Sequence, residues 1–103
     1  MKLLNIDHIP GAEIEALGLV RGTVVQSKHF GKDLMAGLKT LVGGEITGYT
    51  EMLNEARAIA TKRMVDEAEA LGADAIVNVR YGSSAIMDGA AEVLAYGTAV
   101  RIK

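Results

Sequence analysis

The sequence predicts an α+β fold in which a small antiparallel sheet packs against one long helix. Residues 50–71 carry apolar side chains at three- and four-residue spacings, whereas residues 75–87 and 91–102 alternate on either side of an Asp-Gly pair. Residues 14–27 form a further extended segment rich in valine and leucine. A period near 3.6 is typical of a helix and a period of two is typical of a strand, so each segment has a distinct prediction.

The composition indicates one soluble domain with an aliphatic core. The 103 residues match the usual size of one domain, and we expect a single domain over residues 1–103. Half of the residues are hydrophobic, yet the chain has no Trp, one Phe and three Tyr. The net charge of -2 comes from 11 basic and 13 acidic residues that are mixed along the chain. Binding to a phosphate backbone needs a clustered positive face, so we expect no nucleic-acid partner.

The sequence also predicts a cytoplasmic protein without a membrane partner. The chain has no cysteine, which excludes disulfides and thiolate ligands and fits a reducing compartment. The N-terminus reaches Asp7 before the apolar core of a signal peptide can develop, and no later apolar run is long enough to span a bilayer.

The first half of the chain predicts two strands and a helix. Residues 3–6 read as a short strand that ends before the Pro10-Gly11 turn. In residues 14–27, Gly18 and Gly22 are more damaging to a helix than to a bulged strand, so we expect a strand. Residues 30–42 return to helical spacing, and the two glycines that follow are suited to end a helix.

The main helix is predicted from Thr50 to Leu71. Thr50 is a suitable N-cap, Glu51 complements the positive end of the helix dipole, and Gly72 ends the helix. Half of the apolar stripe is alanine, which lets a sheet or another subunit approach the helix backbone closely. The stripe consists of Leu53, Ala56, Ala60, Met64, Ala68 and Leu71.

A β-hairpin follows the helix. In its first strand the alternation predicts that Val77, Val79 and Tyr81 share one face with Ala75. Asp-Gly at 88–89 is a strong turn signal, and residues 91–102 return with apolar or small side chains on both faces. A strand that is apolar on both faces needs a cover on each. Because one helix covers only one face, we infer that the second face is buried between subunits.

Several short motifs, taken in order, resemble the YbjQ family. They are Gly43-Gly44 with Tyr49, then Glu55-Ala56-Arg57, residues 71–77 (LGADAIV) and residues 96–100 (YGTAV). The resemblance covers residues 6–102. It implies a dodecin-like β-α-β-β subunit, a ring-shaped homopentamer and a heavy-metal-binding label. The sequence departs from what that label most needs, since it has no cysteine and only two histidines.

A divalent metal site has one candidate pair, His29 and Asp33, which are four residues apart at a predicted helix start. Two ligands are too few for a closed site, so His8, Asp7 or Glu45 would have to complete it in the fold or across a subunit boundary. The alternative is that His29 is solvated and Asp33 faces a neighbouring lysine.

A small ligand has four candidate side chains, Arg57, Arg80, Ser83 and Glu92. Arg80 and Ser83, with Ser84 beside them, lie on the outgoing strand and could hold a carboxylate or a phosphate. Arg57 lies in the family motif on the helix, and Glu92 on the returning strand is one possible partner for it. The alternative is that exposed Arg and Ser side chains at this strand are solvated or pair with an acid of a neighbouring subunit.

No motif for nucleophilic catalysis is present, because the chain lacks cysteine and has no serine in a Gly-x-Ser-x-Gly elbow. Our leading hypothesis is therefore a non-enzymatic homo-oligomer, expected to be a pentamer, that binds a metal or a small ligand at subunit boundaries. Two alternatives stay open. One is an enzyme whose site lies between subunits, and the other is a scaffold that binds other proteins.

Overall fold

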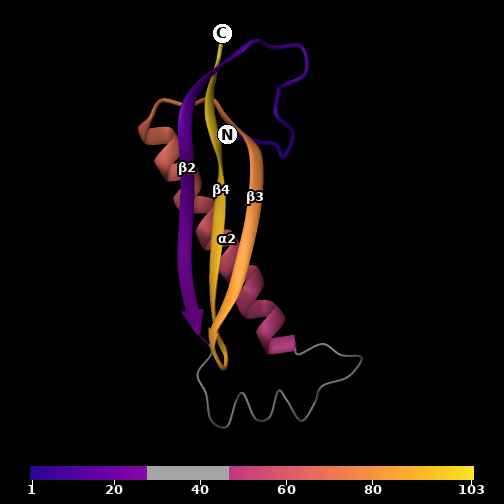
Figure 1. The fold of residues 1–103 in the computed structure, drawn as a ribbon, viewed down its shortest axis with the longest axis vertical. Helices are drawn as coiled ribbons and strands as arrows, with labels where there is room; N and C mark the ends of the chain where they lie inside the picture. Colours follow the sequence, from indigo (N-terminus) through magenta and orange to yellow (C-terminus); the bar gives the residue numbers. More distant parts are fainter. Residues whose placement is uncertain (28–46) are drawn as a thin grey trace.

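The computed structural model describes residues 1–27 and 47–103, which form a four-stranded sheet with one long helix across one of its faces (Figure 1). The predicted α+β class is confirmed. The sheet order is β1-β3-β4-β2, with β1 parallel to β3 and the other pairs antiparallel. The sheet is therefore mixed, and the prediction of a wholly antiparallel sheet is wrong because β1 adds to the edge of β3 in parallel. The predicted helix over residues 30–42 lies outside the described residues. The elements are β1 (Lys2–Leu3), β2 (Ile14–Ser27), α2 (Thr47–Ala70), β3 (Ala75–Met87) and β4 (Ala90–Ile102).

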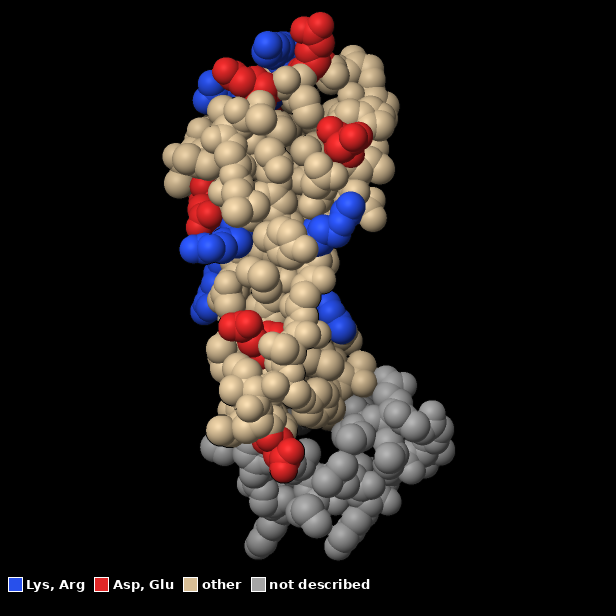
Figure 2. All heavy atoms as spheres, viewed as in Figure 1, with Lys and Arg blue, Asp and Glu red and all other residues tan. Residues whose placement is uncertain are grey.

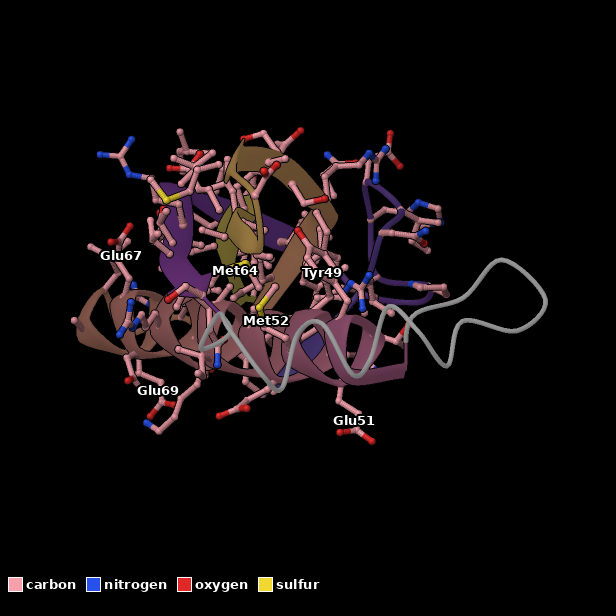
Figure 3. The ribbon with its side chains drawn as sticks, turned by 90° about the horizontal axis from the view of Figure 1, so that it is seen from below. Tyr49, Glu51, Met52, Met64, Glu67 and Glu69 are labelled. Atoms are coloured by element: carbon pink, nitrogen blue, oxygen red, sulfur yellow. The ribbon has the colours of Figure 1, made fainter. Side chains whose placement is uncertain are left out.

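Helix α2 starts at Thr47, three residues before the predicted start, and ends at Ala70. Leu71 therefore follows the helix, and it is 45% exposed, so its predicted place in the apolar stripe is wrong. Figure 3 shows Met52 and Met64 pointing from the helix toward the sheet. The buried side chains of the helix recur every four residues: Met52, Ala56, Ala60, Met64 and Ala68.

No helix within the described ranges is long and apolar enough to cross a membrane.

The helix backbone approaches β2 most closely at Gly22. A Cβ atom at this position would stand 2.5 Å from the amide nitrogen of Met64 and 2.9 Å from the Cβ of Arg63, and nearer still to the carbonyl oxygen of Ala60. Ala60 and Met64 are fully buried at this crossing. The close approach expected from the alanine-rich stripe is therefore present. It also requires glycine on the strand, because any side chain at position 22 would collide with the helix backbone.

A β-bulge at Asn78 changes which side chains of β3 share a face. Asn78 has φ 55°, and the register with β4 shifts between Val77 and Arg80. One extra residue exchanges the two faces from that point on. Val79 consequently packs in the helix-side core, whereas Val77 packs on the opposite face. The prediction that Val77, Val79 and Tyr81 share a face is wrong for this reason.

Among the described residues, the sheet face opposite the helix is only partly covered. Ile9, in the segment between β1 and β2, is 6% exposed and packs in a cluster with Ala75, Val77 and Val100. Further along the strands, three large side chains of this face stay uncovered: Leu19 (66% exposed), Val25 (60%) and Tyr96 (38%). We call the surface formed by Leu19, Val25 and Tyr96 the open face. Figure 2 shows it as largely uncharged, with charges gathered at the margins and ends of the molecule.

Candidate functional site

Metal ligands do not converge in the part of the chain that the structure describes. Within residues 1–27 and 47–103, no three His, Cys, Asp or Glu side chains come together. His29 and Asp33 lie outside the described residues. His8 Nδ1 lies 2.9 Å from Asp7 Oδ1, but both side chains are exposed neighbours in sequence. Two such ligands fall short of the three or four of a zinc site, so these residues of one chain do not fit a heavy metal.

The contact between Asp7 and His8 has an electrostatic effect on the carboxylate. The hydrogen bond from His8, and then the charge of its ring, lower the pKa of Asp7 below its usual value of 3.8. The contact with His8 favours the ionised form of the carboxylate, although the carboxylate is exposed to solvent.

Arg80 and Glu92 do not come together. The guanidinium of Arg80 donates from Nη1 to the carbonyl oxygen of Asn5 (2.9 Å) and to that of Val79 (3.2 Å). It therefore holds the N-terminal segment against β3. In the sheet register Arg80 lies opposite Tyr96, four residues along β4 from Glu92, which corresponds to about 13 Å.

Ser83 is separated from Arg80 by the pleat of the sheet. Ser83 lies opposite Val93, whose side chain is in the helix-side core, whereas Ser84 lies opposite Glu92. Neighbouring residues of a strand point to opposite faces. Arg80 and Ser84 thus share the face away from the helix, and the predicted cluster of Arg80 with both serines does not form.

Arg57 and Ser83 flank a bond between the helix and β3. The hydroxyl of Tyr81 lies 2.8 Å from Thr61 Oγ1. Figure 1 shows α2 and β3 running in opposite directions, so the turn of α2 before Thr61 and the part of β3 after Tyr81 extend the same way. Arg57 is one turn before Thr61, and Ser83 is two residues after Tyr81 on the same side of β3. We call these four residues the α2–β3 junction.

The polar groups of the α2–β3 junction are already partly oriented. Thr61 Oγ1 donates to the carbonyl oxygen of Arg57 at 2.7 Å, so the hydroxyl of Tyr81 is left as the donor to Thr61. Arg57 Nη1 donates to Asn54 Oδ1 at 2.7 Å. A guanidinium has five N–H donors in a planar fork, and Asn54 takes one. The remaining donors suit a carboxylate or a phosphate.

The sequence pointed to Arg57 and Ser83, but the possible partner that it offered for Arg57 was Glu92, which lies on the other side of the sheet. It missed Thr61 and Tyr81 as the residues that join the two elements. The four-residue spacing of Arg57 and Thr61 was the available signal, because such residues share a helix face.

The comparisons with known proteins identify the family. A family model described as "Putative heavy-metal-binding" matches residues 1–103. The chain belongs to the YbjQ family. Its relatives include UPF0145 proteins from Clostridium novyi, 64% identical over 102 residues and covering 99% of each chain, and from Alkaliphilus metalliredigens, 62% identical over 101 residues and covering 98% of each. The names of these relatives state no activity.

A solved structure shows the same fold. The crystal structure of a DUF74-family protein of unknown function from Pediococcus pentosaceus matches this YbjQ chain with a TM-score of 0.67. The match covers 100% of this chain and 98% of the other, at 17% sequence identity. At this identity the likeness concerns the fold alone, and it agrees with the sheet and helix described above.

Proposed function

We propose that this YbjQ-family protein is a cytoplasmic, non-enzymatic homo-oligomer that binds a small oxyanion. The observation that carries the oligomer is the open face. Leu19 and Val25 are 66% and 60% exposed on a sheet whose opposite face is covered by α2. Large uncovered apolar side chains on one sheet face mark an interaction surface. The resemblance to the YbjQ family implies that the assembly is a ring of five chains.

The non-enzymatic part of the proposal is supported by the placement of the ionisable groups. Among the described residues, no polar or charged residue is buried. Acid and base catalysts depend on burial or close like charges to bring their pKa values near the working pH. Exposed groups of this kind are better suited to holding a ligand than to transferring its protons.

The ligand is proposed to bind at the α2–β3 junction, with Arg57 as its charged anchor and Ser83 as a hydroxyl donor. Asn54 and the Tyr81–Thr61 bond orient the two elements that carry these groups. A carboxylate or phosphate accepts hydrogen bonds from a guanidinium and from a hydroxyl.

Light scattering after size exclusion tests the oligomer. We expect about five times the 10.9 kDa mass of one chain. Val25→Lys would place a charge on the open face and reduce this mass, whereas Lys62→Glu, on the exposed side of α2, would leave it unchanged. A parent protein that elutes with the mass of one chain would disprove the assembly.

Isothermal titration calorimetry with inorganic phosphate and with citrate measures the binding affinity and tests the ligand class. We expect Arg57→Lys to weaken binding about tenfold, because an ammonium cannot form the two parallel hydrogen bonds of a guanidinium. Arg21→Lys, on the other sheet face, is the matched control. Equal binding by the two variants would remove the α2–β3 junction from consideration.

The metal label calls for a separate measurement. Native mass spectrometry of the assembled protein with Zn, Cu and Ni would show whether one ion binds per chain. Specific binding that His29→Ala abolishes would support a site that includes His29 and Asp33, and would replace the oxyanion proposal as the primary function.

A further inference from the structure

A pocket opens where the N-terminal segment lies against β3. The main-chain amide of Asn78 donates to the carbonyl oxygen of Ile6, and that of Val79 donates to the carbonyl oxygen of Leu4, each at 2.9 Å. Figure 2 shows the outline of the molecule hollowed on the β3 side, below the N-terminal segment. The pocket has a volume of about 370 Å³, which is enough for a small ligand. We call it the β3-edge pocket, and its lining residues are Leu3, Leu4, Asn5, Val79 and Tyr81.

Most residues that line the β3-edge pocket are apolar. Leu3 and Leu4 are half-buried, and Leu3 packs against the helix-side core that includes Val79. The hydroxyl of Tyr81 is already bonded to Thr61 Oγ1. At about 30 Å³ for each non-hydrogen atom, the volume corresponds to about a dozen atoms. The pocket therefore suits a short aliphatic chain or one aromatic ring.

The guanidinium of Arg80 is held at the border of this pocket. Its Nη1 donates to the carbonyl oxygen of Asn5 at 2.9 Å and to that of Val79 at 3.2 Å, and both of these residues line the pocket. The two bonds occupy both hydrogens of Nη1. A guanidinium has five N–H donors, so three remain on Nε and Nη2, and they have no acceptor within residues 1–27 and 47–103.

The positive charge of Arg80 is also left without an acid. In the part of the chain that the structure describes, no Asp or Glu oxygen lies within 4.0 Å of this guanidinium. The free Nε and Nη2 groups lie along one edge of the guanidinium, and such an edge matches the two oxygens of a carboxylate. The two carbonyl contacts limit the motion of the side chain, so less entropy is lost when a ligand binds.

The charge and the pocket together select one class of ligand. A neutral apolar molecule would leave the guanidinium without an anion, and a bare oxyanion would leave the pocket unfilled. We propose that the β3-edge pocket binds a small organic monocarboxylate. Its carboxylate contacts Arg80, and its aliphatic or aromatic body packs against Leu3, Leu4 and Val79. This site is separate from the α2–β3 junction, whose anchor is Arg57, so either proposal can fail alone.

Isothermal titration calorimetry with hexanoate tests the site, with acetate and 1-hexanol as ligands that each lack one half of the recognition. We expect hexanoate to bind at least about tenfold more tightly than either, because only hexanoate combines the charge with an apolar chain. Acetate that binds as tightly as hexanoate would overturn the role of the pocket. No heat of binding with hexanoate up to about 10 mM would overturn the site altogether.

Two arginine variants test the anchor. Arg80→Lys should weaken hexanoate binding about tenfold, because an ammonium cannot form two parallel hydrogen bonds to a carboxylate. Arg21→Lys is the matched control, since Arg21 lies opposite Tyr96 on β2 just as Arg80 lies opposite Tyr96 on β3. The control should bind hexanoate as the parent does. Equal binding by the two variants would overturn the assignment to Arg80.

Methyl NMR of the unsubstituted protein locates the ligand without a variant, because Arg80→Lys also loses contacts to the N-terminal segment. Hexanoate should shift the methyl signals of Leu3, Leu4 and Val79, whereas inorganic phosphate should leave them unchanged. Hexanoate shifts confined to the methyl group of Thr61 would overturn the β3-edge pocket and leave the α2–β3 junction standing. Hexanoate binding in the pocket by a protein that does not bind phosphate would support the pocket and overturn the junction alone.

Discussion

Replacing Gly22 by alanine is expected to separate helix α2 from strand β2. The new Cβ would lie 2.5 Å from the amide nitrogen of Met64 and closer to the carbonyl oxygen of Ala60. Ordinary contacts need about 3.5 Å, so the helix must move outward by about 1 Å. Both opposing atoms belong to the helix backbone, and no side-chain rotation can relieve the contact.

The cost follows from this displacement. Overpacking a core costs about 1–3 kcal/mol, and a gap of about 1 Å forfeits up to about half of the dispersion energy of the atoms that separate. The lower entropy of an unfolded alanine chain returns about 0.4–1 kcal/mol. We therefore expect the free energy of unfolding to fall by about 2–3 kcal/mol, which lowers the Tm by about 10–20 °C.

Urea denaturation followed by circular dichroism, at one protein concentration, measures this difference. Gly82→Ala is the matched control, because Gly82 also lies within a strand and a Cβ there would meet no atom within 4 Å. The control should be as stable as the parent protein or up to about 1 kcal/mol more stable. If the free energies of unfolding of Gly22→Ala and Gly82→Ala differ by less than about 0.5 kcal/mol, the close approach of helix and strand does not constrain position 22.

Three further predictions concern single groups. Asn78→Ala should lower the free energy of unfolding by about 1 kcal/mol, because φ 55° is unfavourable for alanine, while Asn78→Gly should be tolerated in the same urea titration. Tyr81→Phe removes the hydroxyl that contacts Thr61 and should cost about 0.5–1 kcal/mol; a loss below about 0.2 kcal/mol would show that this bond does not join β3 to α2. The pKa of Asp7 is lowered in the folded chain, so its contribution to stability is present above its usual value of 3.8 and is lost as the pH falls through the lower folded value. An NMR titration should find the Asp7 pKa below 3.8 in the parent and closer to 3.8 in His8→Ala.

Local patterns in the sequence predicted most of the elements. The strand from Ile14 to Ser27, the turn at residues 88–89 and the returning strand follow from two-residue periodicity and turn chemistry. The helix was predicted within three residues at its start, because its apolar spacing is strong. The predicted class of fold depends on these local signals alone.

The candidate site was predicted less well. Arg57 and Ser83 were named, but Arg80 and Glu92 were expected to share their surroundings, and the structure places both on the opposite side of the sheet from Ser83. Face assignments along β3 depend on the bulge at Asn78. A single positive φ angle carries no periodic signal in a sequence, so the exchange of faces could not be anticipated.

The sequence by itself determined the order and type of the elements, because hydrophobic period, turn residues and caps act within a few residues of one another. The tertiary structure decided which residues meet. Helix α2 crosses the sheet at Gly22, its charged side chains Arg63 and Glu67 reach the edge of β2, and the N-terminal segment bonds to β3 as far as Val79. These contacts join residues that are 38 or more positions apart, and their energies depend on crossing angle and register, neither of which is a local property of the chain.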